Sequence, residues 1–212
     1  MIILLDNGHG IDTRGKCSPD KRLLEWRYTR DIVVALSEEL LCEGIDTRIL
    51  VPENGDVPLS ERCRRAAAIC RSVGNDNVAL ISIHVNAAGN DGQWHGATGW
   101  EAFTSPGKTR ADTLAEYLYS AAGFVLSPLL SPGIGSRRPV KILRTDLSDG
   151  DRDKEARFKI LVSTPCPAVL TENLFQDNRE DVDFLLSPVG RNAIVSLHKH
   201  GILNYIRHTA NP

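Results

Sequence analysis

The chain has 212 residues, of which 42% are hydrophobic and 25% are charged, and these values exclude a disordered, collagen-like or long coiled-coil protein. Its 25 basic and 27 acidic residues leave a net charge of −2, so no overall positive field favours binding of nucleic acid or of an anionic lipid surface. The length favours one domain, and we expect residues 1–212 to form it.

The sequence carries no sign of a membrane span or of a signal peptide. No apolar segment approaches the roughly 18 residues that a membrane-spanning helix needs. The N-terminal segment MIILLDNGHG lacks the basic region and the small-residue cleavage site of a signal peptide. The five cysteines form no C-x-x-C motif, which predicts free thiols in a protein made in a reducing compartment.

Strand-like and helix-like segments alternate along the chain, which predicts an α/β fold with a largely parallel sheet. In chain order we expect a strand at Ile2–Asp6, a helix over about Arg22–Glu43, a strand at Thr47–Val51, a helix at Pro58–Val73, strands at Val78–His84 and Gly99–Phe103, a helix at Thr109–Ala122, strands at Val140–Leu143 and Ala168–Glu172, and a helix at Val189–Ile206. The Gly- and Pro-rich stretches Val85–Thr98 and Phe124–Arg138 are predicted loops that would form the walls of a site.

Polar side chains follow three of the predicted strands at the point where each strand ends. His9 follows the first strand, and His84 and Glu172 end two later strands. If these strands are parallel neighbours, their carboxyl ends share one edge of the sheet, and the three side chains can converge there. Gly8 and Gly10 flank His9 and predict a tight turn that aims its imidazole.

Glu25 is a further candidate because it lies on the apolar face of its predicted helix. At about 100° per residue, Glu25 shares one stripe with Ile32, Leu36 and Leu40. An inward carboxylate needs a partner, since an unpaired buried charge is very costly. A metal ion and an arginine are the two common partners.

Two imidazoles and one carboxylate suit Zn²⁺ and leave a coordination position open for water. A further carboxylate would then move the proton, and Glu172 is the candidate. Plainer interpretations stay open at this point: a lone histidine is more often a surface or packed residue than a ligand, Glu25 could pair with an arginine, and Glu172 could simply end its strand.

Other polar residues near the predicted site have two interpretations each. Asn86 could position a substrate or stabilise a turn. Arg62 could reach a carboxylate near the site and touch the substrate, although a surface charge on its helix is the more ordinary interpretation. His198 and His200 are two residues apart on a helix and do not share a face, so we expect both at the surface.

These residues lie in an ordered set of motifs that spans essentially the whole chain. The motifs are I-L-L-D-N-G-H-G at 3–10, the helix that starts at Glu25, V-P-L-S-E-R at 57–62, S-I-H-V-N-A at 82–87, G-W-E-A-F at 99–103, P-A-V-L-T-E-N-L-F-Q-D-N at 167–178 and G-I-L-N-Y-I at 201–206. In this order and spacing, the sequence resembles the zinc-dependent N-acetylmuramoyl-L-alanine amidases of bacterial cell walls and of phage or spore lysins.

The resemblance implies a central mixed, twisted sheet flanked by helices, with Zn²⁺ held by His9, Glu25 and His84. It also implies that Glu172 is the catalytic carboxylate. The implied partner is peptidoglycan, and the implied reaction is cleavage of the amide bond between N-acetylmuramic acid and L-alanine of the stem peptide. Action on the cell wall without a signal peptide suggests either cytoplasmic synthesis with release at lysis or a truncated secreted protein.

The chain also departs from the family pattern. Asn7 stands where the family usually has proline, and Asn173-Leu174 follow Glu172 where the family usually has a hydrophobic residue and then glycine. The segment 124–159 matches poorly. Two alternatives therefore remain beside the amidase: a muropeptide-binding protein of the same fold that does not cut, and a zinc deacetylase that acts on another acyl-amide.

Overall fold

The computed structural model describes residues 1–130 and 142–210. Its strands are β1 (Ile2–Asn7), β2 (Thr47–Ile49), β3 (Val78–Asn86), β4 (Glu101–Thr104), β5 (Lys154–Glu155) and β6 (Ala168–Phe175). Its helices are α1 (Glu25–Cys42), α2 (Leu59–Val73), α3 (Arg110–Leu130), α4 (Lys159–Val162), α5 (Arg179–Leu186) and α6 (Pro188–Ala210), with a 3₁₀ turn η1 at Asn75–Asn77.

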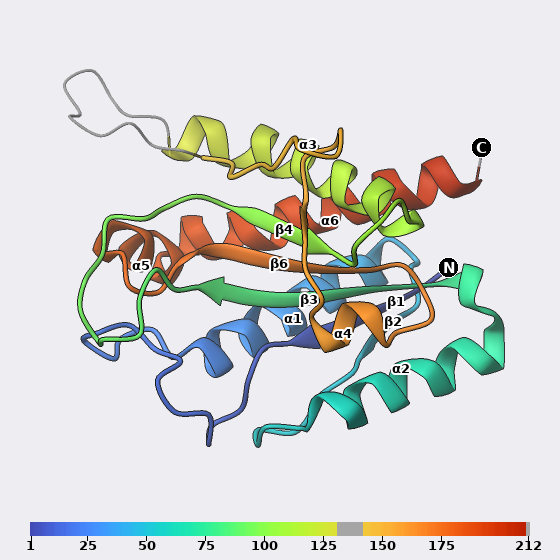
Figure 1. The fold of residues 1–212 in the computed structure, drawn as a ribbon, viewed down its shortest axis with the longest axis horizontal. Helices are drawn as coiled ribbons and strands as arrows, with labels where there is room; N and C mark the ends of the chain where they lie inside the picture. The colour runs from blue at the N-terminus through green and yellow to red at the C-terminus, as the bar shows by residue number, and fades with distance from the viewer. Residues whose placement is uncertain (131–141, 211–212) are drawn as a thin grey trace.

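The described strands form one sheet in the order β2-β1-β3-β6-β4-β5 (Figure 1). The neighbours β2, β1, β3 and β6 run parallel, and β4 is antiparallel to β6. The predicted α/β class, with a mixed and mostly parallel sheet, is therefore confirmed.

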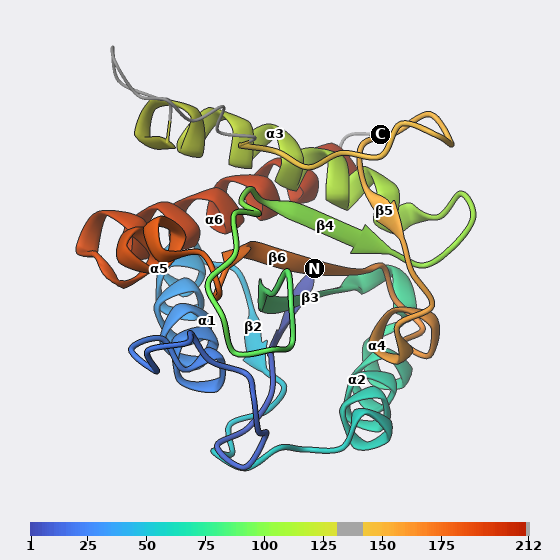
Figure 2. The same cartoon turned by 60° about the vertical axis from the view of Figure 1, so that its left-hand side comes forward.

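Helices cover both faces of this sheet, as the sequence predicted. Figure 2 shows α1, α3, α5 and α6 on one side and α2 and α4 on the other. Two apolar cores result, because alternate residues of a strand point to opposite faces. Ile3 and Leu5 of β1 pack in the core under α1 and α6, whereas Ile2 and Leu4 pack in the core under α2.

The central strands are buried on both faces, so polar residues are confined to their carboxyl ends. In β3, Val78–Ile83 are buried and His84 is the first residue that reaches solvent. The Cα atoms of His84 and Glu172 are register partners on β3 and β6, and β1 runs beside β3 up to the pair Asn7–Ile83. The topology thus brings the three predicted strand ends to one edge of the sheet.

Some element boundaries differ from the predictions. The third helix continues to Leu130, so residues 124–130 of the predicted loop are helical, because Leu126 extends the buried face of the helix, and the rest of that predicted loop lies outside the described residues. The predicted strand Val140–Leu143 lies partly outside the described residues, and Leu143 makes only an isolated bridge to Trp100. The short helices α4 and α5 were not predicted.

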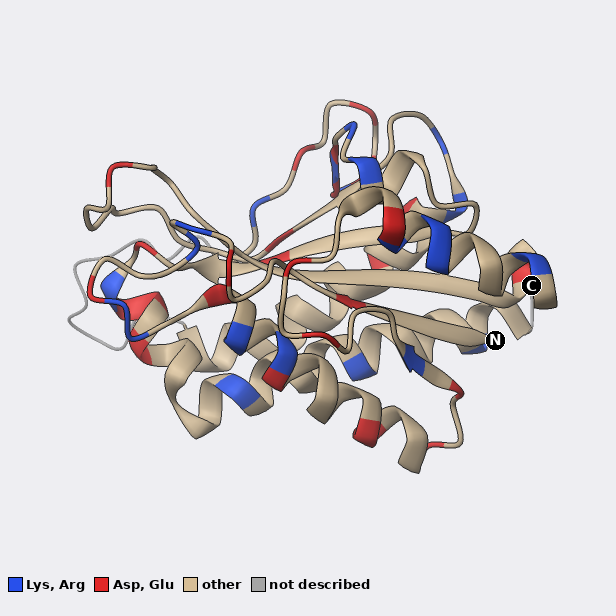
Figure 3. Cartoon of the chain, turned by 90° about the horizontal axis from the view of Figure 1, so that it is seen from below, with Lys and Arg blue, Asp and Glu red and all other residues tan. Residues whose placement is uncertain are grey.

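The described surface carries charges of both signs. In the view of Figure 3, lysine and arginine residues are interspersed with aspartate and glutamate residues over helices and loops. Among the described residues, none of the helices is long and apolar enough to cross a membrane.

Candidate active site

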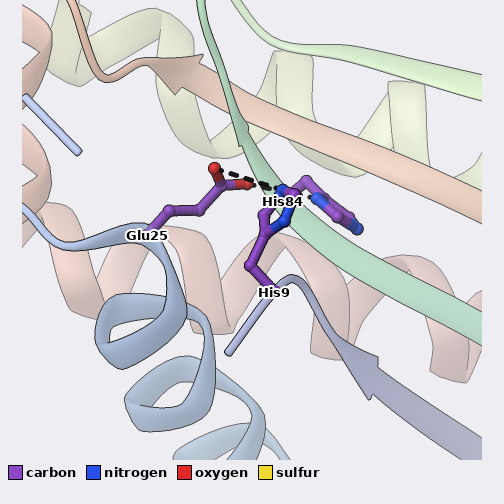
Figure 4. Close-up of side chains that lie close together, drawn as sticks. All are labelled: His9, Glu25 and His84. Carbon is purple, nitrogen blue, oxygen red and sulfur yellow. Dashed lines mark hydrogen bonds and ion pairs between the residues drawn. The ribbon is translucent and has the colours of Figure 1, made fainter. Parts of the chain in front are cut away.

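Three predicted metal ligands from separate segments lie together at the carboxyl edge of the sheet (Figure 4). His9 follows β1, Glu25 is the first residue of α1, and His84 lies near the end of β3. One ligand atom of each residue lies within 4.8 Å of the others. The structure therefore brings His9, Glu25 and His84 into the arrangement that a metal site requires.

The Glu25 carboxylate is the centre of this cluster. Its Oε1 atom lies 3.1 Å from Nδ1 of His84 and accepts the backbone N–H of Val85 at 3.0 Å. Its Oε2 atom lies 3.5 Å from Nε2 of His9. The two imidazole rings meet edge to face, with 5.1 Å between their centroids.

The turn around His9 differs in one respect from the expectation. His9 itself, and not a flanking glycine, adopts the left-handed backbone conformation, with φ of 59°. The glycines are needed for space: a Cβ atom on Gly8 would lie 2.6 Å from Nδ1 of His84, and one on Gly10 would collide with the backbone of Asp56. Helix α1 holds this turn, because Arg30 donates a 2.9 Å hydrogen bond to the carbonyl oxygen of His9.

Without a cation, Glu25 is favoured as a carboxylate and His9 as a neutral ring, whereas His84 is favoured in its protonated form, so a cation would have to displace a proton from His84. Burial opposes the charge of Glu25, but the hydrogen bond with His84 and the charges of both imidazoles lower its pKa below the ordinary value. Burial likewise opposes protonation of His84, yet Glu25 raises the pKa of His84. Burial lowers the pKa of His9 to about 4 and keeps this ring neutral, as a metal ligand must be.

The donor set fits Zn²⁺. Glu25 Oε2 is buried and accepts no hydrogen bond from the described residues, which is a costly state for a carboxylate oxygen. A cation between Glu25 and the two imidazoles would satisfy that oxygen, and two imidazoles with one carboxylate are a ligand set that zinc accepts.

Glu172 lies beside this cluster as the register partner of His84. Its Oε2 atom is buried and has no hydrogen-bond partner among the described residues. Burial raises the pKa of Glu172 to about 8, and the negative charges of Glu25 and Glu101 act in the same direction. A carboxyl group whose pKa lies near neutrality can both accept and return a proton.

The strand that carries Glu172 is irregular just after this residue. Between the pairs His84–Glu172 and Asn86–Phe175 the register shifts, so β6 contains one extra residue in a β-bulge. Leu174 in this bulge has φ of 61° and is fully buried. Leucine therefore adopts the left-handed conformation at the position where the family pattern has glycine.

Asn173 connects the strands on either side of Glu172. Its Nδ2 atom donates to the carbonyl oxygen of His84 at 2.9 Å, and its Oδ1 atom accepts the indole N–H of Trp100 at 2.9 Å. The first bond fixes the backbone of β3 against β6 next to the two site residues, and the second joins β6 to the buried Trp100.

His198 is fully buried, so the prediction that it lies at the surface is wrong. Its Nδ1 atom lies 2.7 Å from the carbonyl oxygen of Ile194, and its Nε2 atom lies 2.9 Å from the hydroxyl of Thr171. The carbonyl can only accept, so Nδ1 carries the proton and Nε2 accepts from Thr171. The face of α6 that carries His198 packs against the sheet, whereas His200 is exposed as predicted.

The burial of His198 predicts a pH-dependent stability. Burial lowers the pKa of His198 to about 4, whereas the unfolded chain takes up the proton near 6.5. The free energy of unfolding should therefore fall as the pH drops from 6.5 towards 4, by at most about 1.4 kcal/mol per pH unit from this group. Urea denaturation across this range should show a weaker pH dependence in His198→Gln than in the parent. The control His200→Gln should keep the parent slope, and an unchanged slope in His198→Gln would contradict the assignment.

Arg62 is buried, so the ordinary interpretation as a surface charge on its helix is wrong. Its guanidinium donates to Asp6 at 2.8 Å, to the carbonyl oxygen of Asn7 and to Asp56 at 2.9 Å. These contacts join the end of β1 to the loop before α2. Arg62 does reach carboxylates near the site, and its contact with substrate stays a prediction.

Removal of the Arg62 charge should destabilise the fold strongly. The substitution Arg62→Met leaves the buried carboxylate of Asp6 without its ionic partner. We expect a loss of about 3–5 kcal/mol in the free energy of unfolding, as is typical when one member of a buried ion pair is removed. Urea denaturation measures this loss. The exposed Arg64 on the same helix supplies the matched control Arg64→Met, which should change stability by less than about 1 kcal/mol.

Asn86 lies at the same edge and is engaged within the chain. Its Nδ2 atom donates to Glu101 at 2.7 Å, and its Oδ1 atom accepts the N–H of Ala87 at 2.8 Å. Glu101 also accepts from Arg144 and from Lys154, at 2.7 and 2.6 Å. This ion cluster was not predicted from the sequence. The signal for it was Glu101, a charged residue in the middle of the otherwise uncharged segment G-W-E-A-F, because a buried charge needs a partner. A role of Asn86 in substrate binding stays a prediction.

Comparison with known proteins agrees with this geometry. The model of the N-acetylmuramoyl-L-alanine amidase family matches residues 3–204. The chain is 29% identical over 206 residues to the N-acetylmuramoyl-L-alanine amidase CwlM of Bacillus licheniformis, and 23% identical over 206 residues to an endolysin of Bacillus phage SPP1. These matches cover 94% and 95% of the chain but only 66% and 64% of the two relatives.

Among solved structures, an N-acetylmuramoyl-L-alanine amidase from Clostridium difficile 630 has the same fold. The two superpose with a TM-score of 0.75 at 20% identity, over 97% of this chain and 96% of the other. The family match extends over nearly the whole sequence, and the matched range includes the candidate site residues. The chain therefore belongs to the N-acetylmuramoyl-L-alanine amidase family.

Proposed function

We propose that this protein is a zinc-dependent N-acetylmuramoyl-L-alanine amidase that acts on the bacterial cell wall. Its substrate would be peptidoglycan, and it would hydrolyse the amide bond between the lactyl group of N-acetylmuramic acid and L-alanine of the stem peptide. The observation that supports this most directly is the convergence of His9, Glu25 and His84 beside Glu172, in a chain of this family.

In this proposal His9, Glu25 and His84 hold the zinc ion. When bound, zinc supplies a Lewis acid that polarises the scissile carbonyl group and makes water more acidic. Glu172 removes a proton from the attacking water as the water oxygen adds to the carbonyl carbon. The same carboxyl group then gives the proton to the amide nitrogen as the C–N bond breaks, which leaves a lactyl carboxylate and the free amino group of L-alanine.

The surroundings of Glu172 suit this double role. Burial raises the pKa of this carboxyl group to about 8, and a cation held by the neighbouring residues would lower the pKa towards neutrality. General acid–base catalysis is most effective when the pKa of the group lies near the working pH.

The test is digestion of purified peptidoglycan sacculi, with mass spectrometry of the products in the presence and absence of a chelator. Release of stem peptides with a free L-alanine amino group, lost with chelator and restored by zinc, is the expected result. Binding to sacculi without release would favour a binding protein, and cleavage of acetamides alone would favour a deacetylase. Release that persists after complete metal removal would refute the zinc requirement.

A further inference from the structure

Two aspartates lie together in the segment that leads into β5, at the edge of the sheet beside β4 (Figure 2). Asp153 is only 2% exposed, and Oδ2 of its carboxyl group accepts the hydroxyl of Thr104 at 2.6 Å. Asp151 is partly buried, and its carboxyl group lies within hydrogen-bonding reach of that of Asp153. The two acidic groups are therefore neighbours below the surface.

One oxygen atom of each carboxyl group is left without a partner. Oδ1 of Asp151 and Oδ1 of Asp153 are both buried and accept no hydrogen bond from the described residues. A carboxylate oxygen in this state is costly, because it has lost its water and has gained no donor. Two ionised carboxylates have no proton to share, so a positive group between them is needed to offset this cost.

The basic residues on either side of Asp153 in the sequence do not supply that positive charge. Arg152 donates to Glu116 from Nη2 at 2.6 Å and from Nε at 3.0 Å. Lys154 donates to Glu101 at 2.6 Å. Both basic side chains are thus held by other carboxylates and do not neutralise the aspartate pair.

The electrostatic surroundings of the pair are negative. The charged groups outside the pair that act on it most strongly are Asp149, Asp112 and Glu116. Burial raises the pKa of Asp153 to about 7, and the negative charges of Asp151 and Asp112 act in the same direction. Ionisation of the pair at pH 8 therefore adds buried negative charge at a place that already has an excess of it.

The spacing of the acidic residues is that of the first half of a calcium-binding loop. Asp149, Asp151 and Asp153 occupy alternate positions of the segment D-G-D-R-D, as do the first three ligands of an EF-hand loop. The segment is not a complete EF-hand, because Ile160 stands at the position of the bidentate glutamate of that loop. The spacing agrees with a cation that prefers oxygen ligands.

We propose that Asp151 and Asp153 bind a calcium ion through their unpartnered Oδ1 atoms. Calcium takes about six to eight oxygen ligands in a flexible geometry, so backbone carbonyl groups and water can complete a shell to which the protein gives two carboxylates. The ion would tie the segment before β5 to β4, because Asp153 is also bonded to Thr104. This site shares no residue with the candidate metal cluster or with Glu172, and it does not depend on the proposed function.

The test is the midpoint of thermal unfolding, Tm, of the full chain at pH 8 and constant ionic strength. One equivalent of zinc is added first, so that the histidine cluster does not take up the second ion. A calcium site with two carboxylates should have a Kd of about 10⁻⁴–10⁻³ M, and calcium chloride at about ten times this concentration should raise Tm by about 3–6 °C. Magnesium chloride should give a smaller shift, because Mg²⁺ demands near-octahedral geometry. An equal shift would overturn the assignment to calcium.

Asp153→Asn keeps the shape of the side chain and an oxygen atom that can accept from Thr104, but it removes one of the two charges. We expect this variant to lose the calcium shift, whereas its Tm without calcium should be no lower than that of the parent, because the repulsion within the pair is gone. Asp151→Asn, at a partly exposed position, is a second variant that should lose the shift. The control Glu38→Gln, on the exposed face of α1, should keep the full shift.

Isothermal titration with calcium chloride measures the stoichiometry, and we expect one ion per parent chain and none in Asp151→Asn. A calcium shift that persists in both asparagine variants would place the ion elsewhere and overturn the proposal. Absence of a calcium shift in the parent would also overturn it. If, in that case, the Tm of the parent rises from pH 8 to pH 6 and that of Asp153→Asn does not, the pair shares a proton instead of a metal ion.

Discussion

Glu172→Gln should retain zinc and lose nearly all turnover. Glutamine keeps the shape of the side chain and leaves the three proposed metal ligands untouched, but it can neither accept nor return the proton in hydrolysis. A general acid–base group typically contributes about 10²–10⁴-fold to the rate, and we expect a loss of this size in kcat. The measurements are the initial rate of stem-peptide release from sacculi and the zinc content by elemental analysis.

The matched control for this variant is Glu38→Gln, which removes a carboxylate from the exposed face of α1. Its rate and zinc content should equal those of the parent. If Glu172→Gln keeps more than about a tenth of the parent rate, another group acts as the base, because so small a loss is below the range for general base catalysis.

His84→Ala should abolish stoichiometric zinc binding and, with it, hydrolysis. The substitution removes one of three protein ligands and also the ring that hydrogen-bonds to Oε1 of Glu25. Two remaining side chains do not complete a site of the kind that zinc occupies in hydrolases, which has three protein ligands. Elemental analysis after dialysis against zinc measures the bound metal, and circular dichroism verifies that the protein is folded.

His95→Ala is the control for this experiment. His95 lies in the loop after β3, where its Nε2 atom pairs with Asp91 at 2.9 Å, and it is not part of the metal-ligand cluster. This variant should keep one zinc ion per chain. One zinc ion per chain in folded His84→Ala would remove His84 from the set of ligands.

The sequence predicts the centre of the fold well because its signal is local. The buried strands β1, β3 and β6 begin as apolar runs, and polar residues follow these runs towards the end of each strand. The parallel order of these strands then places His84 opposite Glu172. Glu25 was found through helical periodicity, which indicates the face of a helix without any knowledge of its neighbours.

The features that the sequence does not predict depend on neighbours that are distant in the chain. The acceptors around Arg62 come from β1 and from the loop before α2, so its burial cannot be deduced from its helix. His198 is buried because its side of α6 faces Thr171 in the sheet. The helix α5 was missed although Asn178 caps it by accepting hydrogen bonds from the N–H groups of Glu180 and Asp181.

The wide separation of the proposed metal ligands along the chain has a consequence for folding. Residues 9 and 25 meet residue 84 only after β1 has paired with β3 and α1 has docked on the sheet. The unfolded chain therefore has no preformed cage, and a metal ion would bind almost exclusively to the native state. Such an ion shifts the folding equilibrium towards the native state by mass action. It would therefore stabilise the N-terminal half of the molecule in addition to its role in hydrolysis.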